Sequence, residues 1–304
     1  MLLLDYLAQR FRYHDARGWT AVIAAGHVEV EGRRARAETH VHAGNVVTYH
    51  KLHQEPFAVL DVRVLHEDAD LLALDKPAHL PMHADGPFVR NTLVQVMRQR
   101  FDTPELSLVH RLDRETSGVC VVARTATART ELQRQFLAGS VRKVYHAIVR
   151  GHVAAPFTVA LPIGRSTESC IQLRRAAGAA AANPQDAHTA FWPEAHGDRV
   201  TLLRCEPTTG RTHQIRVHLE ANGTPIVGDK LYGRPDADYL AFVARVKANG
   251  DARVVPAGEV DRHLLHASEL VLRHPRTGAT ATYRAPLPAC MQTLVPVVPP
   301  PTDA

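Results

Sequence analysis

The stretch His110-Arg-Leu-Asp-Arg-Glu-Thr-Ser-Gly118 leads directly into an apolar segment, Val119–Ala123. This pattern predicts a loop that enters a β-strand, with Asp113 at the mouth of the strand. Arg111 and Arg114 flank Asp113, and a guanidinium group close to a carboxyl group lowers its pKa. We therefore expect an ionised carboxylate that can act as a nucleophile or a base. An ion pair that only orders the loop is the alternative.

Around this stretch, strand patterns follow one another with few helices between them. We expect strands at 57–65, 71–75, 118–124, 143–150, 200–205, 212–219, 263–272 and 279–284, and helices at 92–100 and 127–138. Successive strands without an intervening helix favour an α+β fold with a mixed, largely antiparallel sheet over a doubly wound parallel sheet.

Changes of pattern divide the chain of 304 residues into four segments. We expect a small N-terminal α/β module at 1–50, a linker at 51–56, the main domain at 57–290 and a Pro-rich disordered tail at 291–304. Within the module, Thr20 is a candidate cap for a helix at 21–25. Within the main domain, the Ala-rich stretch 174–182 is predicted to be a loop or a frayed helix.

Composition excludes several classes of protein. Apolar residues make up 45% of the chain, an ordinary globular value, yet no apolar run approaches the roughly 18 residues that a membrane span requires. The start of the chain does not read as a signal peptide, and the four cysteines contain no CxxC pair. We therefore expect a cytoplasmic protein with reduced thiols and no membrane partner.

The stretch Thr208-Thr-Gly-Arg-Thr-His-Gln-Ile-Arg-Val-His-Leu219 alternates in polarity after Gly210. As a strand it would place Gln214 and Arg216 on one face, where Arg216 would be a rigidly held partner for a carboxylate or a phosphate. A solvated arginine on an exposed strand is the alternative. On a strand, His213 and His218 would face opposite ways and could not bind one metal ion together.

A third stretch, Arg142-Lys-Val-Tyr-His-Ala-Ile-Val-Arg-Gly151, is predicted to be a strand that carries Tyr145. A tyrosine among basic residues can stack on a base, although simple packing is the commoner role of a strand tyrosine. Residues 124–150 contain six basic residues and one acidic residue, Glu131. This local surplus favours a nucleic-acid partner.

Motifs for other chemistries are absent from the sequence. The histidines lack a recognised spacing for metal ligands, so we expect no metal site. The chain has no phosphate-binding Walker loop and no G-x-G-x-x-G, and therefore no nucleotide cofactor is indicated. A serine hydrolase is disfavoured because no G-x-S-x-G elbow occurs.

Together these stretches resemble the RluA-type pseudouridine synthases. The similar segments occur in the order of that family and span about residues 57–290; they are 67–77, 110–118, 143–145, 209–219, 225–229, 231–233, 264–267 and 274–278. Residues 1–50 resemble, more weakly, a small RNA-binding module that is shared with a small-subunit ribosomal protein and is often fused to these enzymes.

The resemblance implies that uridine in RNA becomes pseudouridine without a cofactor, by cleavage of the N1–C1′ bond and formation of a C5–C1′ bond. It implies that Asp113 is the essential carboxylate, that Arg216 is its ion-pair partner, and that Tyr145 packs on the base and assists proton removal from C5. Further substrate contacts are expected from Arg111, Arg114, Arg211 and Gln214, with Leu265 as an apolar wall of the pocket.

Several alternatives stay open at this stage. Asp113 could attack C1′ or abstract a ribose proton. Ribosomal RNA is the preferred partner and transfer RNA the second, and we expect a monomer. A catalytically silent RNA-binding protein on the same fold is the rival function, and a hydrolase or deaminase on the same scaffold is a third possibility.

Overall fold

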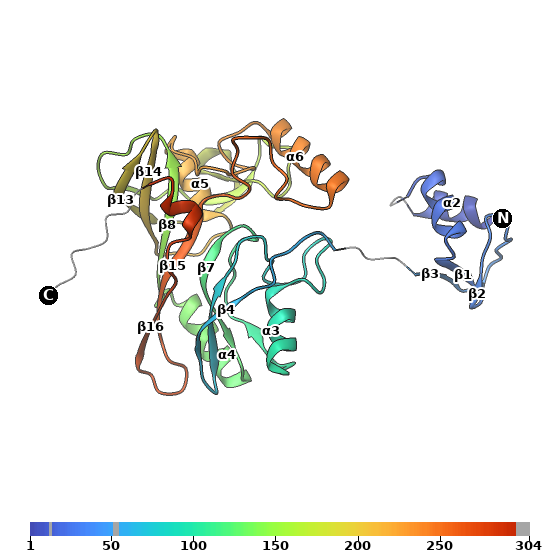
Figure 1. Cartoon of the computed structure of the whole chain (residues 1–304), viewed down its shortest axis with the longest axis horizontal. Coiled ribbons are helices and arrows are strands. Elements are labelled where there is room, and N and C mark those ends of the chain that lie inside the picture. Colours follow the sequence, from blue (N-terminus) through green and yellow to red (C-terminus); the bar gives the residue numbers. More distant parts are fainter. Residues whose placement is uncertain (12–13, 51–54, 296–304) are drawn as a thin grey trace. The chain divides into compact units, whose positions relative to one another are not determined.

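The computed structural model describes residues 1–11, 14–50 and 55–295 (Figure 1). The chain forms two compact units, Met1–Gln54 and Glu55–Ala304. Most of the predicted linker, residues 51–54, lies outside the described residues. Every helix in the described ranges is too short or too polar to span a lipid bilayer.

The smaller unit packs two helices against a three-stranded antiparallel sheet of order β2-β1-β3. Its elements are α1 (Leu3–Arg10), α2 (Ala16–Ala24), β1 (Val28–Val30), β2 (Arg33–Arg34) and β3 (Val47–Tyr49). Trp19 is fully buried at the centre, among Leu3, Leu7, Ile23 and Val28. A large aromatic side chain at this point supplies much of the apolar area that so small a unit can bury.

The second helix of this unit begins earlier than predicted. Asp15, not Thr20, is its N-cap, and the Asp15 carboxylate accepts a hydrogen bond of 2.7 Å from the backbone N–H of Gly18. Thr20 lies inside the helix, where its hydroxyl donates to the carbonyl of Ala16 at 2.9 Å. Both residue types can cap a helix, and the carboxylate also complements the positive end of the helix dipole.

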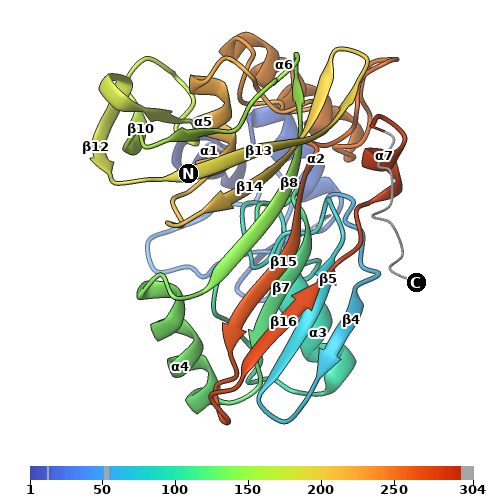
Figure 2. The same cartoon turned by 90° about the vertical axis from the view of Figure 1, so that its left-hand side faces the viewer.

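The larger unit is built on one mixed sheet of ten strands, most of them antiparallel, as predicted (Figure 2). Eight strands follow the order β4-β5-β7-β15-β8-β14-β13-β9, while β16 pairs with β15 and β6 pairs with β7. Only the pairing of β15 with β7 is parallel among the described strand pairs.

The bounds of the strands are β4 (Arg63–Glu67), β5 (Leu71–Lys76), β6 (Ser107–Leu108), β7 (Ser117–Ala123), β8 (Arg142–Arg150), β9 (Phe157–Val159), β10 (Ile163–Ser166), β11 (Arg175–Ala177), β12 (Ala181–Gln185), β13 (Thr189–Gly197), β14 (Val200–Pro207), β15 (Leu265–Arg273) and β16 (Thr280–Arg284). The helices are α3 (Leu93–Phe101), α4 (Ala126–Leu137), α5 (Gln214–Ala221), α6 (Asp236–Asn249) and α7 (Ala289–Gln292).

Helices cover both faces of the sheet at β5 and β7 (Figure 2). Leu71 and Ala73 pack with Leu132 of α4 on one face, whereas Leu72 and Leu74 pack with α3 on the other. Burial on both faces explains why β5 and β7 read as continuous apolar runs and not as alternating patterns.

The prediction of a strand at 212–219 is wrong. Residues Gln214–Ala221 form helix α5, which begins at His213 in the left-handed conformation, with φ 61°. All residues from Gln214 to Leu219 are buried. A short helix that is buried all round has no polar stripe, so its 3.6-residue period is invisible in the sequence and the alternation was misleading.

The Ala-rich stretch 174–182 was also predicted incorrectly. It forms β11 and the start of β12, joined by a 3₁₀ turn at Gly178–Ala180, and both strands pair with β10 in a second, three-stranded sheet. Alanine favours helices in isolation, but pairing with an existing strand outweighs a weak local preference.

The tail does not begin at residue 291. Helix α7 spans Ala289–Gln292, and both Met291 and Val295 are fully buried in the core formed by β8, β14 and α5. The prolines of residues 296–304, on which the prediction of disorder rested, lie outside the described residues.

We expect Met291→Ala to lower the free energy of unfolding of the larger unit by about 2–5 kcal/mol, because it leaves a cavity in a packed core. Cys290→Ala is the matched control, since Cys290 is exposed and the same helix carries it. Its effect should stay within about 0.5 kcal/mol. Urea unfolding of the full chain, followed by circular dichroism, measures both, and equal midpoints would show that Met291 is not part of the core.

Candidate active site

Asp113 lies in the loop that precedes β7, as predicted. The backbone N–H of Thr116 donates to the carbonyl of Asp113 at 3.1 Å and closes a turn. At the start of the strand, Gly118 has a φ of 106°, and a Cβ there would come within 2.1 Å of the Ala267 carbonyl oxygen on β15. Only glycine allows the loop and β15 to approach this closely, which fixes the position of Asp113 relative to β15.

Arg216 of α5 reaches Asp113 from the opposite side. Its Nη1 donates to Asp113 Oδ2 at 2.8 Å, and its side chain is 8% exposed. The structure thus brings together the two residues that the motifs predict as an ion pair. The partner residue comes from a buried helix and not from the predicted strand.

Asp229 holds Arg216 in place and was not predicted as a site residue. Arg216 Nε and Nη2 donate to the two oxygens of Asp229 at 2.7 and 2.9 Å, a bidentate pair that leaves Nη1 for Asp113. The backbone N–H groups of Leu231 and Tyr232 also donate to Asp229 Oδ1. The only signal in the sequence is the position of Asp229 in a family motif, because nothing local marks it as a partner of Arg216.

Burial and charge act against each other at Asp113. Burial raises the pKa of its carboxyl group, but His213 in its protonated form, the charge and hydrogen bond of Arg216, and the charge of Arg111 together outweigh burial, and the net pKa lies below the ordinary value. Burial lowers the pKa of His213 to about 4, so its ring is neutral at pH 7. Arg216 is therefore the charge that keeps Asp113 ionised at neutral pH.

A cleft of about 810 Å³ opens beside this ion pair. Of the predicted site residues, it is lined by Arg111, Asp113, Tyr145, Arg211, Gln214, Arg216 and Leu265. Arg114 does not line it, because its side chain pairs with Glu115 at 3.3 Å and lies over the ring of Phe88. The predicted substrate contact of Arg114 is thus not supported at this cleft.

Gln214 lines the cleft, but its amide is occupied by the protein. Its Oε1 accepts from the Thr209 hydroxyl and the Arg211 N–H at 2.7 and 2.9 Å, while Nε2 donates to the His188 carbonyl and the Thr189 hydroxyl, both at 3.0 Å. These bonds use the full capacity of an amide. The geometry therefore gives Gln214 a bracing role in place of the predicted contact with substrate.

Tyr145 and Leu265 form apolar parts of the cleft wall. They lie on the adjacent strands β8 and β15, where Leu265 pairs with Ala147, two residues beyond Tyr145. Burial raises the pKa of the Tyr145 hydroxyl, and the negative charge of Asp113 raises it further. Tyr145 is therefore a neutral phenol at pH 7 that can pack on a flat ring and donate one hydrogen bond.

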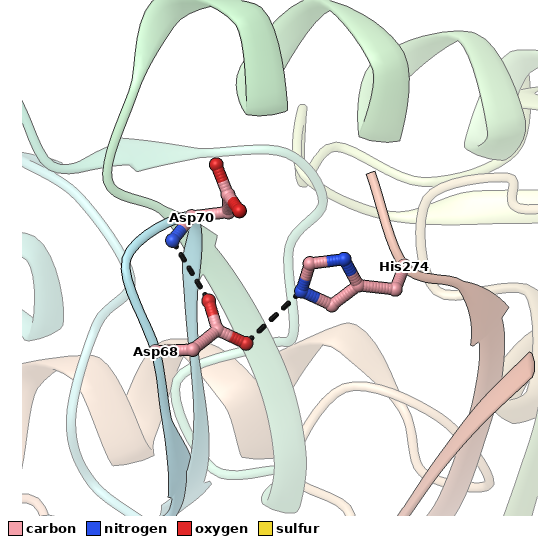
Figure 3. Close-up of side chains that lie close together, drawn as sticks. All are labelled: Asp68, Asp70 and His274. Atoms are coloured by element: carbon pink, nitrogen blue, oxygen red, sulfur yellow. Dashed lines mark hydrogen bonds and ion pairs between the residues drawn. The ribbon is translucent and has the colours of Figure 1, made fainter. Parts of the chain in front are cut away.

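One group in the described part of the chain has side chains close enough to hold a metal ion. Asp68, Asp70 and His274 bring ligand atoms within 4.8 Å of one another, between the β4–β5 turn and the end of β15 (Figure 3). However, Arg276 donates to both oxygens of Asp70 at 2.7 and 2.8 Å, and Asp68 accepts from His274 at 3.0 Å. These contacts are those of an ion network that joins the two segments, and a metal ion would have to displace Arg276.

Comparisons with known proteins agree with the geometry of the site. Residues 70–221 match the RNA pseudouridylate synthase family. An uncharacterized RNA pseudouridine synthase of Synechocystis sp. is 31% identical over 289 residues, which cover 94% of each chain. The ribosomal large subunit pseudouridine synthase D of Pseudomonas aeruginosa is 33% identical over 94% of this chain and 88% of its own.

The solved structure of human RNA pseudouridylate synthase domain containing 1 superposes with a TM-score of 0.60 at 28% identity, over 77% of this chain and 86% of that one. The family match, the similarity along nearly the whole length and the common fold agree with the motifs around Asp113 and Arg216. This chain therefore belongs to the RluA-type RNA pseudouridine synthases.

Proposed function

We propose that this enzyme isomerises uridines of large-subunit ribosomal RNA, with Asp113 as the essential carboxylate. Family membership gives the reaction class, the conversion of uridine in RNA to pseudouridine. The Pseudomonas aeruginosa relative is named for the ribosomal large subunit, which supports the choice of RNA. The ion pair between Asp113 and Arg216 inside the cleft carries the mechanistic part of the proposal.

The reaction is an isomerisation, so its atoms balance within the substrate and the protein. The N1–C1′ bond breaks, a C5–C1′ bond forms, a proton leaves C5 and a proton is delivered to N1. An ionised carboxylate beside the ribose serves both candidate first steps, attack at C1′ or removal of a ribose proton. Arg216 supplies that ionised state at neutral pH. No step calls for a redox group or a cofactor.

Tyr145 and Leu265 would hold the detached base while it turns. The ring must rotate before C5 can bond to C1′, and it must not escape into solvent. An apolar wall beside the carboxylate serves this purpose, because it packs on the face of the base without forming hydrogen bonds to its polar edge that would prevent rotation. Tyr145 lines this cleft, and we propose that its phenol assists the transfer of the C5 proton.

Arg111 and Arg211 are suited to bind the phosphates next to the target nucleotide. Both line the cleft and both are exposed, while the Nε of Arg211 is anchored on the carbonyl of Asp186 at 3.0 Å. A uridine inside a duplex must be flipped out at a cost of a few kcal/mol. Contacts to flanking phosphates offset that cost and make binding dependent on salt.

The remaining parts of the proposal concern the rest of the chain. The N-terminal unit would bind RNA, and the enzyme would act as a monomer without a metal ion. A cytoplasmic location belongs to the same proposal, since bacterial ribosomes, such as those of the relative named above, are assembled there.

The substrate class is tested with unmodified transcripts of large-subunit ribosomal RNA and of transfer RNAs. The purified chain, with no added cofactor, is expected to form pseudouridine at discrete positions in the ribosomal transcript and at least about tenfold more slowly in transfer RNA. Sites are mapped by chemical labelling of pseudouridine and primer extension. Modification restricted to transfer RNA would contradict the choice of ribosomal RNA and leave the reaction class intact.

Asp113→Asn should lower the single-turnover rate by about 1,000-fold or more, because an amide is neither a nucleophile nor a base at neutral pH. The Kd for RNA should change little, since phosphate contacts dominate binding. Release of tritium from [5-³H]uridine in RNA measures turnover, and filter binding measures affinity. A rate within tenfold of wild type would remove Asp113 from the mechanism.

Arg216→Met should slow the single-turnover reaction by about 100-fold, because it removes a preorganised charge beside the reacting carboxylate. It should also change the pH profile. Without the guanidinium, only His213 and Arg111 oppose the effect of burial on the pKa of Asp113, so this pKa rises and activity is lost at a higher pH than in the wild type.

Arg284→Met is the matched control, because Arg284 is a surface arginine on β16 whose side chain is 72% exposed. It removes the same charge at a residue that does not line the cleft. The Arg284→Met control should keep the wild-type rate and the wild-type fall of activity at acid pH. Equal effects of the two substitutions would mean that the local ion pair does not control Asp113.

A further inference from the structure

His213 is the N-cap residue of α5 and lines the cleft next to Asp113. Its side chain is 7% exposed, and its backbone has a φ of 61°, a conformation that few residues other than glycine adopt. Nδ1 lies 2.8 Å from the Tyr232 hydroxyl, and Nε2 lies 3.8 Å from Asp113 Oδ1. The ring therefore connects a buried tyrosine with the carboxylate of the ion pair.

The hydrogen bonds of Tyr232 determine which nitrogen of His213 carries the proton. The backbone N–H of Arg175 donates to the Tyr232 hydroxyl oxygen at 3.1 Å. The hydroxyl proton is then free to point at Nδ1, which accepts it, and the ring proton resides on Nε2. The other tautomer would place the Nε2 lone pair against the negative charge of Asp113, which is unfavourable.

The surroundings of His213 keep this ring neutral. Burial lowers the pKa of His213 to about 4. Asp113 and Asp229 raise its pKa, while Arg216 and Arg175 lower it, and the nearby His263 is itself buried with a pKa well below its usual value. At pH 7 the ring is thus a neutral N–H donor and adds no charge to the cleft.

The carboxylate of Asp113 needs a second donor to be fixed in orientation. Arg216 Nη1 binds Oδ2, and a carboxylate held by one oxygen can still rotate about its Cβ–Cγ bond. A donor to Oδ1 would fix the plane of the group relative to the ribose. Misplacement of a reacting group by about 1 Å can cost about 100-fold in rate.

We propose that His213 is a positioning residue for Asp113, held by the Tyr232 hydroxyl so that its Nε2–H donates to Asp113 Oδ1 when substrate fills the cleft. This inference rests on the proposed function, because it assigns the His213 ring a part in the same reaction. The left-handed backbone conformation of His213 directs its Nε2 toward the Asp113 carboxylate.

A pair of amide substitutions separates this role from a structural one. In His213→Gln the side-chain amide nitrogen can reach the place of Nε2, whereas in His213→Asn it can reach only the place of Nδ1. Asparagine adopts the left-handed backbone conformation more readily than glutamine. A purely structural role therefore favours Asn, and the proposed role favours Gln.

We expect His213→Gln to retain a single-turnover rate within about tenfold of wild type and His213→Asn to fall by about 100-fold. RNA affinity should be unchanged in both. The acid limb of the rate should move to higher pH in the Asn variant alone, because the Asp113 carboxylate loses a donor to its charged form. An Asn variant as fast as the Gln variant, with the wild-type acid limb, would overturn the proposal.

Tyr232→Phe provides a second, independent test should either amide variant fold poorly. It keeps the ring that packs under Arg216 at 4.9 Å and removes only the hydroxyl that orients His213. A fall of about tenfold in rate at constant RNA affinity is expected, and a wild-type rate would count against the proposal. Wild type and Asp113→Asn are assayed in the same experiment. If the wild-type enzyme forms no pseudouridine, the proposed function is wrong, and this failure is distinct from a failure of the proposal for His213.

Discussion

The Arg216 guanidinium lies between two carboxylates, and the proposed active site depends on that arrangement. A buried arginine without a partner would be very costly, and one partner does not use all its donors. Asp229 takes Nε and Nη2, and Asp113 takes Nη1. Loss of Arg216 would leave two buried carboxylates without their common counter-charge, and loss of Asp229 would leave two nitrogens of the buried guanidinium without an acceptor, so the three positions are linked energetically as well as in space.

The fold brings these three groups together from distant parts of the sequence. Asp113 comes from the loop before β7, Arg216 from α5, and Asp229 from the segment that follows α5. Close backbone approaches fix the segments: Gly118 contacts β15, and a Cβ on Gly228 would come within 2.0 Å of the Arg262 carbonyl oxygen. Such contacts leave little room for the ion network to shift, and a preorganised charge does not have to be rearranged during the reaction.

Elements of the fold that have a clear local sequence pattern were predicted correctly. The strands β5 and β7 and the helices α3 and α4 have clear apolar patterns, and the motifs around Asp113 and Arg216 placed both residues in one site. Helix α5 was missed because its residues are buried on all sides, which erases helical periodicity. The strands at 174–185 were missed because their stability comes from pairing with β10.

Asp229 was missed for a related reason. Its role depends on a bidentate contact with a residue on another element, and no spacing in the sequence encodes such a contact. His213 illustrates the same limit. On the predicted strand His213 would face away from Gln214 and Arg216, and only the left-handed turn at the start of α5 directs its ring toward Asp113.

The same charges also separate catalysis from RNA binding. At pH 7 the group formed by Asp113, Arg216 and Asp229 carries one positive and two negative charges, so it repels a phosphate and does not attract one. Affinity for RNA must therefore come from other side chains, and Arg111 and Arg211 are exposed along the cleft. The ionised Asp113 carboxylate can therefore lie next to anionic RNA. The attraction that holds the RNA comes from the exposed arginines of the cleft, whereas the repulsion from the carboxylate acts on one nucleotide only.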